Sequence, residues 1–198
     1  MAFTPDGMGT DTLAVDFDVV CCHVTLLHNF LKKTYSDVNL VCLALFALHP
    51  SEWRDFVQKY AGVDAAAAKT ALTKVTYMGA PDFNLPFLWG LARDVHIASH
   101  LILASPHFAY LRGKFQDRRN PHASRLSYAL CSLEDDVLSN LCEAVNSVDC
   151  AQVVVYMFDG AIIMLDDASL VSDIKLKLDQ AAEQLQVKLK FNLFEHRG

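Results

Sequence analysis

The sequence lacks several features that would assign it to a class at once. None of its six cysteines belongs to a C-x-x-C pair, and no histidine pair stands at zinc-finger spacing, so no zinc finger is predicted. The opening residues MAFTPDGMGT have neither a basic start nor an apolar core. We therefore expect no secretory signal, and an intracellular protein with reduced cysteines.

Long apolar runs are also missing. The most apolar stretch, VNLVCLALFAL at 38–48, has 11 residues, whereas a helix needs about 20 apolar residues to cross a bilayer. We expect this stretch to form a buried helix, and we expect no membrane partner. Internal repeats and low-complexity tracts are absent from the sequence as well.

Positive charge is scarce and unevenly placed. The chain has 17 Lys and Arg against 23 Asp and Glu, for a net charge of −6, which argues against an extensive phosphate-binding surface. Yet one short segment, with Asp117 as its only acid, concentrates basic residues. This basic segment contains Arg112, Lys114, Arg118, Arg119 and Arg125.

The apolar fraction of 53% and the 198-residue length are enough for one sizeable core, or one core with a subdomain. The pattern predicts a strand at 12–20, a block of helices, a hairpin at 153–165, a helix at 169–185 and a strand at 187–194. Strands at both ends around helices indicate an α+β fold with one antiparallel sheet. We expect sheet-forming parts at 1–36 and 115–198 and a helical subdomain at 37–114.

Residues 153–165, VVVYMFDGAIIML, interrupt an apolar run with Asp159 and Gly160. Asp-Gly between two strands is a strong hairpin signal, because turn residues with positive φ favour this pair. Asp159 would then serve the turn alone. The alternative is a metal-binding carboxylate at the hairpin tip. Asp16 and Asp18, which lie two apart and so share one face of the first strand, favour this second interpretation, since carboxylates from two strands can hold two Mg²⁺ ions.

These residues resemble motifs of the family A DNA polymerases, in particular the palm and fingers of divergent viral and mobile-element members. The first motif is a strand with a catalytic aspartate followed five positions later by a sugar-contacting residue; Asp18 and His23 match it. Asp16 is the alternative catalytic position. The second is a fingers helix with a lysine and, eight positions on, a tyrosine; Lys69 and Tyr77 match it.

The third motif is a hairpin with His-Asp-Glu, or Asp-Gly in divergent members, which Asp159 and Gly160 match. The family's helix before this hairpin contacts the primer–template duplex, and here the basic segment leads into that helix. In the first motif the chain keeps only the histidine of the Asn-Ala-His-Pro string of divergent members. In the second motif Gly79 stands one place later than the family's glycine, and two further positions differ. The family's arginine four residues before the lysine is Ala65, and its aromatic residue four after is Thr73.

The resemblance implies template-directed nucleotidyl transfer on primed DNA, with nucleoside triphosphates as substrates. Asp18 and Asp159, with Asp16 as the alternative, would hold Mg²⁺ or Mn²⁺, and Lys69 would neutralise the triphosphate. His23 and Tyr77 would contact the sugar and the templating pair. The family's thumb lies upstream of the first motif, so we expect further domains or subunits to supply it. The rival interpretation is a non-catalytic palm descendant that binds nucleic acid or a partner subunit, and an unrelated α+β interaction module is a third.

His96 and His100 stand four residues apart on a predicted helix. This spacing suits metal chelation, but the sequence shows no third ligand. From the sequence we therefore expect both to be ordinary solvent-facing or core histidines.

Overall fold

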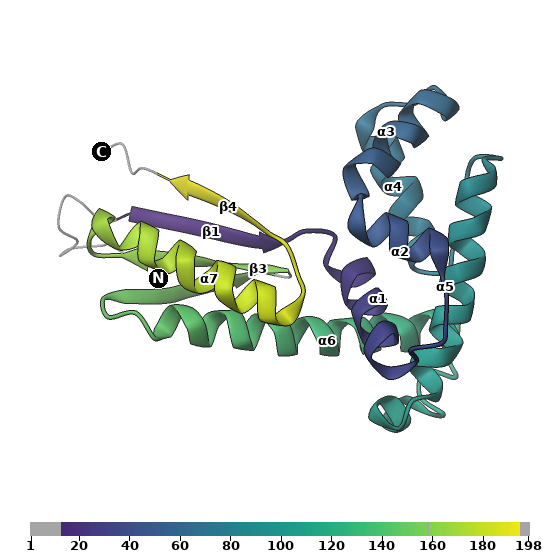
Figure 1. Ribbon diagram of the computed structural model, residues 1–198. Coiled ribbons are helices and arrows are strands. Elements are labelled where there is room, and N and C mark those ends of the chain that lie inside the picture. The colour runs from purple at the N-terminus through teal and green to yellow at the C-terminus, as the bar shows by residue number, and fades with distance from the viewer. Residues whose placement is uncertain (1–12, 158, 195–198) are drawn as a thin grey trace. The chain divides into compact units, whose positions relative to one another are not determined.

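The computed structural model describes residues 13–157 and 159–194. Its helices and its one antiparallel sheet confirm the predicted α+β class (Figure 1). The chain divides into two compact units. The sheet unit consists of Met1–Cys22 and Glu134–Gly198, and the helical unit is the continuous segment His23–Leu133.

Four strands make up the described sheet. They are β1 (Leu13–Val19), β2 (Ala151–Met157), β3 (Gly160–Leu165) and β4 (Leu189–Phe194). Their order is β2-β3-β1-β4, and every neighbouring pair is antiparallel. With helix α6 (Pro121–Asn146) before β2 and helix α7 (Val171–Leu185) before β4, this is the split β-α-β arrangement, in which β1 and β3 occupy the centre. The predicted ranges 1–36 and 115–198 contain all four of these strands.

Alternate residues of the central strands build the core of the sheet unit. Val15 and Phe17 on β1 and Ile163 on β3 are completely buried, and they lie on the same face because side chains alternate along a strand. Ile174 of α7 and Leu141 of α6 are also completely buried, so these helices cover that face (Figure 1). The other face carries Asp16 and Asp18, in register with Ile162 and Gly160 of β3.

The helical unit packs its own core around a long central helix. This central helix is α5 (Pro86–Ala104). The helices before it are α1 (Cys22–Thr34), α2 (Val41–Leu48), α3 (Pro50–Ala61) and α4 (Ala65–Thr76), and a 3₁₀ turn covers Pro106–Leu111. The predicted subdomain range 37–114 contains α2 to α5, while α1 belongs to the helical unit although it lies in the range 1–36. Leu88, Leu91 and Val95 of α5 are fully buried, which places α5 at the centre of this core.

The prediction of a buried helix at 38–48 is wrong for one face of α2. Leu43 and Phe46 are buried, but Val41, Leu45 and Leu48 are about half exposed. The helix also begins later than expected and has no side-chain cap of its own. Instead the buried carboxylate of Asp94, on α5, accepts hydrogen bonds from the backbone N–H groups of Cys42 and Leu43 at 2.8 and 3.3 Å.

Local capping signals fix the ends of α3 and α4. Asp64 caps α4, because its carboxylate accepts a hydrogen bond from the N–H of Ala67 at 2.8 Å. Gly62 ends α3 in the left-handed conformation with φ 68°, where a glycine carries no Cβ penalty. Ser51, although serine is a common N-cap residue, does not cap α3. Pro50 takes the first helical position and His49 becomes the N-cap, since proline at this position lacks only an N–H that the helix would leave unbonded.

Within the described ranges, the helices are too short or too polar for any of them to cross a membrane.

Candidate functional site

The predicted site residues are distributed over both units. In the sheet unit, Asp18 lies near the end of β1, and Asp159 lies in the hairpin turn just before the neighbouring strand β3. Asp18 is in register with Gly160, and Asp159 immediately precedes that glycine. The backbone N–H of Val19 donates a hydrogen bond to the carbonyl of Asp159 at 2.7 Å, so the end of β1 holds the hairpin tip beside Asp18.

The hairpin turn differs from the Asp-Gly turn expected from the sequence. Met157 pairs with Gly160, so Asp159 belongs to the connection and Gly160 is already part of β3. The φ of Gly160 lies outside the left-handed region. A Cβ at this position would stand 2.0 Å from the carbonyl oxygen of Phe17 and 2.6 Å from Oδ1 of Asp18. Glycine is therefore required here because β1 and the Asp18 carboxylate approach so closely.

Negative charge accumulates around Asp18. Burial raises the pKa of the Asp18 carboxyl, and the neighbouring carboxylates of Asp159 and Asp16 raise it further, while Lys190 opposes them. Lys190 is the partner of Asp18 on β4. Sequence reasoning missed this lysine, because the pairing of the first strand with the last cannot be seen from residue spacing.

Asp16 is the more enclosed of the two β1 aspartates. The residue is only 9% exposed, and its Oδ1 has no hydrogen-bond partner among the described residues. A buried carboxylate oxygen without a partner is costly unless a cation or a donor satisfies it. Carboxylate oxygens are the ligands that Mg²⁺ prefers, so the unbonded Oδ1 and the gathered charge around Asp18 fit a divalent cation. Both Asp16 and Asp18 remain candidate ligands beside Asp159.

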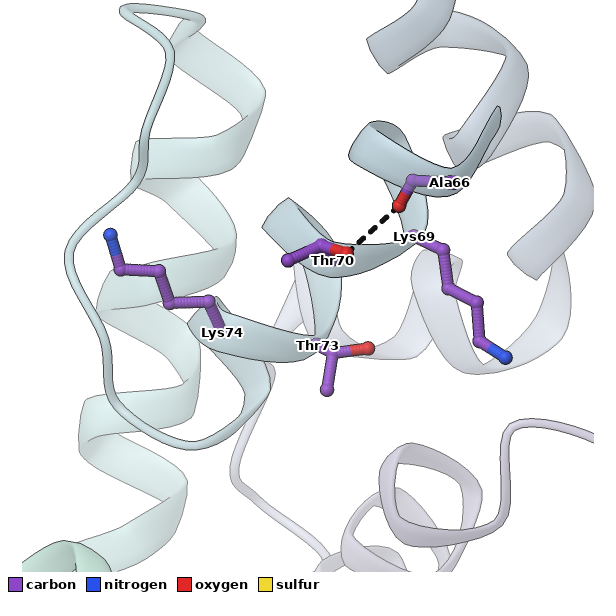
Figure 2. A pocket seen from close by; sticks show the side chains of 5 residues that line it. All are labelled: Ala66, Lys69, Thr70, Thr73 and Lys74. Atoms are coloured by element: carbon purple, nitrogen blue, oxygen red, sulfur yellow. Dashed lines mark hydrogen bonds between the residues drawn. The ribbon is translucent and has the colours of Figure 1, made fainter. Parts of the chain in front are cut away.

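In the helical unit, Lys69 lines an open hollow of about 550 Å³ on α4, together with Ala66, Thr70, Thr73 and Lys74. Figure 2 shows the Lys69 and Lys74 side chains extending in opposite directions from the helix, with the Thr70 hydroxyl bonded to the carbonyl of Ala66. Lys74 forms an ion pair with Asp82. Lys69 is exposed and makes no ion pair within the described part of the chain, so its charge is available to an anionic ligand.

His23 and Tyr77 meet although 54 positions separate them in sequence. Nδ1 of His23, on α1, is hydrogen-bonded to the hydroxyl of Tyr77, the C-cap residue of α4. Their rings meet edge to face, with centroids 5.6 Å apart. Two residues assigned to nucleotide binding by separate motifs are thus brought together within the helical unit.

The basic segment begins just after the 3₁₀ helix, continues through the turns that follow it and ends with Arg125 in α6. Lys114, Arg118 and Arg119 are exposed and have no acidic partner among the described residues. Arg112 and Arg125 instead donate to the backbone carbonyls of Ala104 and Pro121, each at 3.2 Å. Three of the five predicted phosphate contacts are therefore free cations, and the other two are engaged with the backbone.

The sequence matches no protein-family model and has no significant match among curated proteins. The residues and their geometry are therefore the basis for any functional proposal.

Proposed function

We propose that the protein is a nucleotidyltransferase similar to the family A DNA polymerases, acting on primed DNA with nucleoside triphosphates. The observation that carries the proposal is the gathering of three carboxylates near the end of β1: Asp16 and Asp18 on one face of that strand, and Asp159 in the hairpin turn before β3. Carboxylates brought to one place by two segments of a sheet are the ligand set that two-metal phosphoryl transfer uses.

The order of the elements supports the same proposal. A strand with two aspartates comes first, a helix with an exposed lysine follows, and a hairpin with the third aspartate comes last. The first and third elements are adjacent in the sheet, although the whole helical unit lies between them in sequence. The family resemblance requires this order, and chance matches of the first and third motifs would not be expected to lie on adjacent strands.

Each residue has a distinct proposed task. Asp159 and Asp18, or Asp16 in its place, would hold Mg²⁺ or Mn²⁺, which when bound stabilises charge on the attacking and leaving oxygens. Lys69 would neutralise the triphosphate oxygens as a point charge. The hydrogen bond between His23 and Tyr77 would fix both rings for contact with the sugar and the base pair.

The test is primer extension on a primed template with Mg²⁺ or Mn²⁺ and nucleoside triphosphates. We expect weak extension by the parent and none by Asp159→Asn, because the amide keeps the shape of the carboxylate and removes its charge. The matched control is Asp166→Asn, at an exposed position just after β3, which should extend the primer as the parent does. Unchanged extension by Asp159→Asn would contradict the proposal.

The non-catalytic alternative has its own supporting observation. The Lys69 hollow is lined by Ala66 and Thr73, and neither supplies the aromatic surface that the family places four residues after the lysine. If the parent binds primed duplex but never extends it with either metal ion, a nucleic-acid-binding palm descendant becomes the better account. An unrelated interaction module would bind no primed duplex.

A further inference from the structure

We propose that His96, His100 and His122 form a binding site for a divalent transition-metal ion such as Zn²⁺, separate from the carboxylates of the sheet unit. His96 and His100 stand one helical turn apart on α5, and His122 lies in the first turn of α6. All three belong to the helical unit. The third ligand that the sequence did not reveal is thus supplied by the fold.

Ring contacts connect the three histidines in a row. The centroids of His96 and His100 are 4.7 Å apart, and those of His100 and His122 are 4.4 Å apart. Histidines at i and i+4 on one helix face are a known zinc-binding pair. His96 and His100 are exposed, so their rings are free to rotate about the side-chain bonds, and metal binding would require that rotation to bring one nitrogen of each to a common ion.

Ser99 determines which nitrogen His122 can offer. Its hydroxyl donates to the carbonyl of His96 at 2.7 Å, so its single proton is already used. The contact of 2.9 Å between Oγ of Ser99 and Nε2 of His122 must then be a bond donated by Nε2–H. In the neutral ring this leaves the Nδ1 lone pair unprotonated, which is the state that a metal ion requires.

Ser99 is completely buried, which keeps the orientation of His122 fixed. Zinc-binding histidines commonly donate their second ring N–H to an oxygen in this way, and that bond fixes both tautomer and ring. In this cluster Ser99 is a positioning residue, and the three imidazoles are the ligands.

Ligand chemistry selects the ion. Imidazole nitrogen suits Zn²⁺, Cu²⁺ and Ni²⁺, whereas carboxylate oxygen suits Mg²⁺ and Mn²⁺. Three histidines complete three of the four tetrahedral positions around Zn²⁺ and leave one for water. Because the ligands come from α5 and from the start of α6, a bound ion would connect these two helices and stabilise the folded helical unit by mass action.

The test is calorimetric titration of the metal-stripped full chain with zinc chloride. We expect binding by the parent, and at least about tenfold weaker binding for each of His96→Ala, His100→Ala and His122→Ala. The control is His49→Ala, since His49 is an exposed histidine that contacts Glu52 on α3, and its affinity should match the parent's. Ser99→Ala should weaken binding by about 10- to 100-fold, as removal of an oxygen partner of a zinc-bound histidine does.

Thermal denaturation and cobalt(II) spectra test the same three-histidine site independently. Thermal denaturation of each metal-free variant should resemble that of the parent, and added zinc should raise the melting temperature of the parent more than that of His122→Ala. Cobalt(II) in place of zinc should give a spectrum without sulfur-to-metal charge transfer. Charge transfer from a cysteine, or zinc affinity unchanged in all three histidine variants, would overturn the proposal.

Discussion

Gly160 and Asp18 are the residues on which the geometry of the candidate metal site depends most directly. Because Gly160 has no Cβ, the Asp18 carboxylate can lie where that atom would otherwise clash with it. Because the carbonyl of Phe17 lies against the same point, any side chain at position 160 would push β1 away from β3. The position of one carboxylate therefore depends on the absence of a side chain on the next strand.

Gly160→Ala should destabilise the protein by about 1–3 kcal/mol, the usual cost of overpacking a tight site. The added methyl would meet backbone and cannot be relieved by a rotamer change. Gly90→Ala is the control, because its Cβ would meet only the Cys42 side chain, which can move. Chemical denaturation measures both. A Gly160→Ala variant as stable as the parent would contradict the close approach of β1.

The raised pKa of Asp18 predicts a pH dependence of stability. The folded state keeps a proton on Asp18 above the ordinary value of 3.8, where the unfolded state has lost it, so the free energy of unfolding decreases as pH rises through this window. Asp18→Asn removes the effect. We expect a higher melting temperature than the parent at pH 7 and no such gain below the window.

Melting temperatures between about pH 3 and pH 7 would test this, with Asp37→Asn as a control. Asp37 is exposed, and within the described ranges its side-chain bond is the local one from Ser36, so its substitution should leave the pH dependence of the parent's melting temperature unchanged. If the melting temperature of the parent rises over this pH window and Asp18→Asn removes the rise, the prediction is contradicted.

Among the elements, the turn that precedes α6 carries exposed cations that form no ion pair with the described residues. Arg118 and Arg119 are exposed in this turn. If they contact DNA phosphates, Arg118→Ala/Arg119→Ala should weaken binding about equally for all sequences. It should also reduce the slope of log affinity against log salt by about two units, since each phosphate contact contributes about 0.9.

The control for this double variant is Lys32→Ala/Lys33→Ala, which removes the same charge from the last turn of α1. Binding of a primed duplex at several salt concentrations gives both slopes. Equal slopes for the two double variants would mean that the turn before α6 contributes only general charge.

Element types could be read from the sequence, and some of their details could not. The Asp64 cap and the Gly62 stop are local signals, so the sequence alone indicates them. The exposed side of α2 was missed, because hydropathy alone does not say which faces find partners. The cap on α2 was missed for a related reason, since Asp94 belongs to another helix and its 2.8 Å bond to Cys42 is a tertiary contact.

At the scale of the whole molecule, the α+β class was predicted correctly because strands at both ends of a helical block allow few other folds. The partners of the site residues were harder to predict. Lys190 beside Asp18, and His122 beside His100, depend on pairings between distant parts of the chain. Motif spacing cannot contain such pairings, whereas the aspartates and Lys69 could be selected from their residue types alone.

The sheet unit is discontinuous in sequence, and this affects how the protein folds. β1 is a central strand, yet its neighbours β3 and β4 are made only after the whole helical unit. During synthesis the helical unit can fold from consecutive residues. Until β3 and β4 have been made, β1 remains unpaired, and its apolar Val15 and Phe17 are exposed to solvent. Such long-range pairing is slow and prone to aggregation. A chaperone that covers the first strand until the last one emerges would therefore be expected to raise the yield of folded protein.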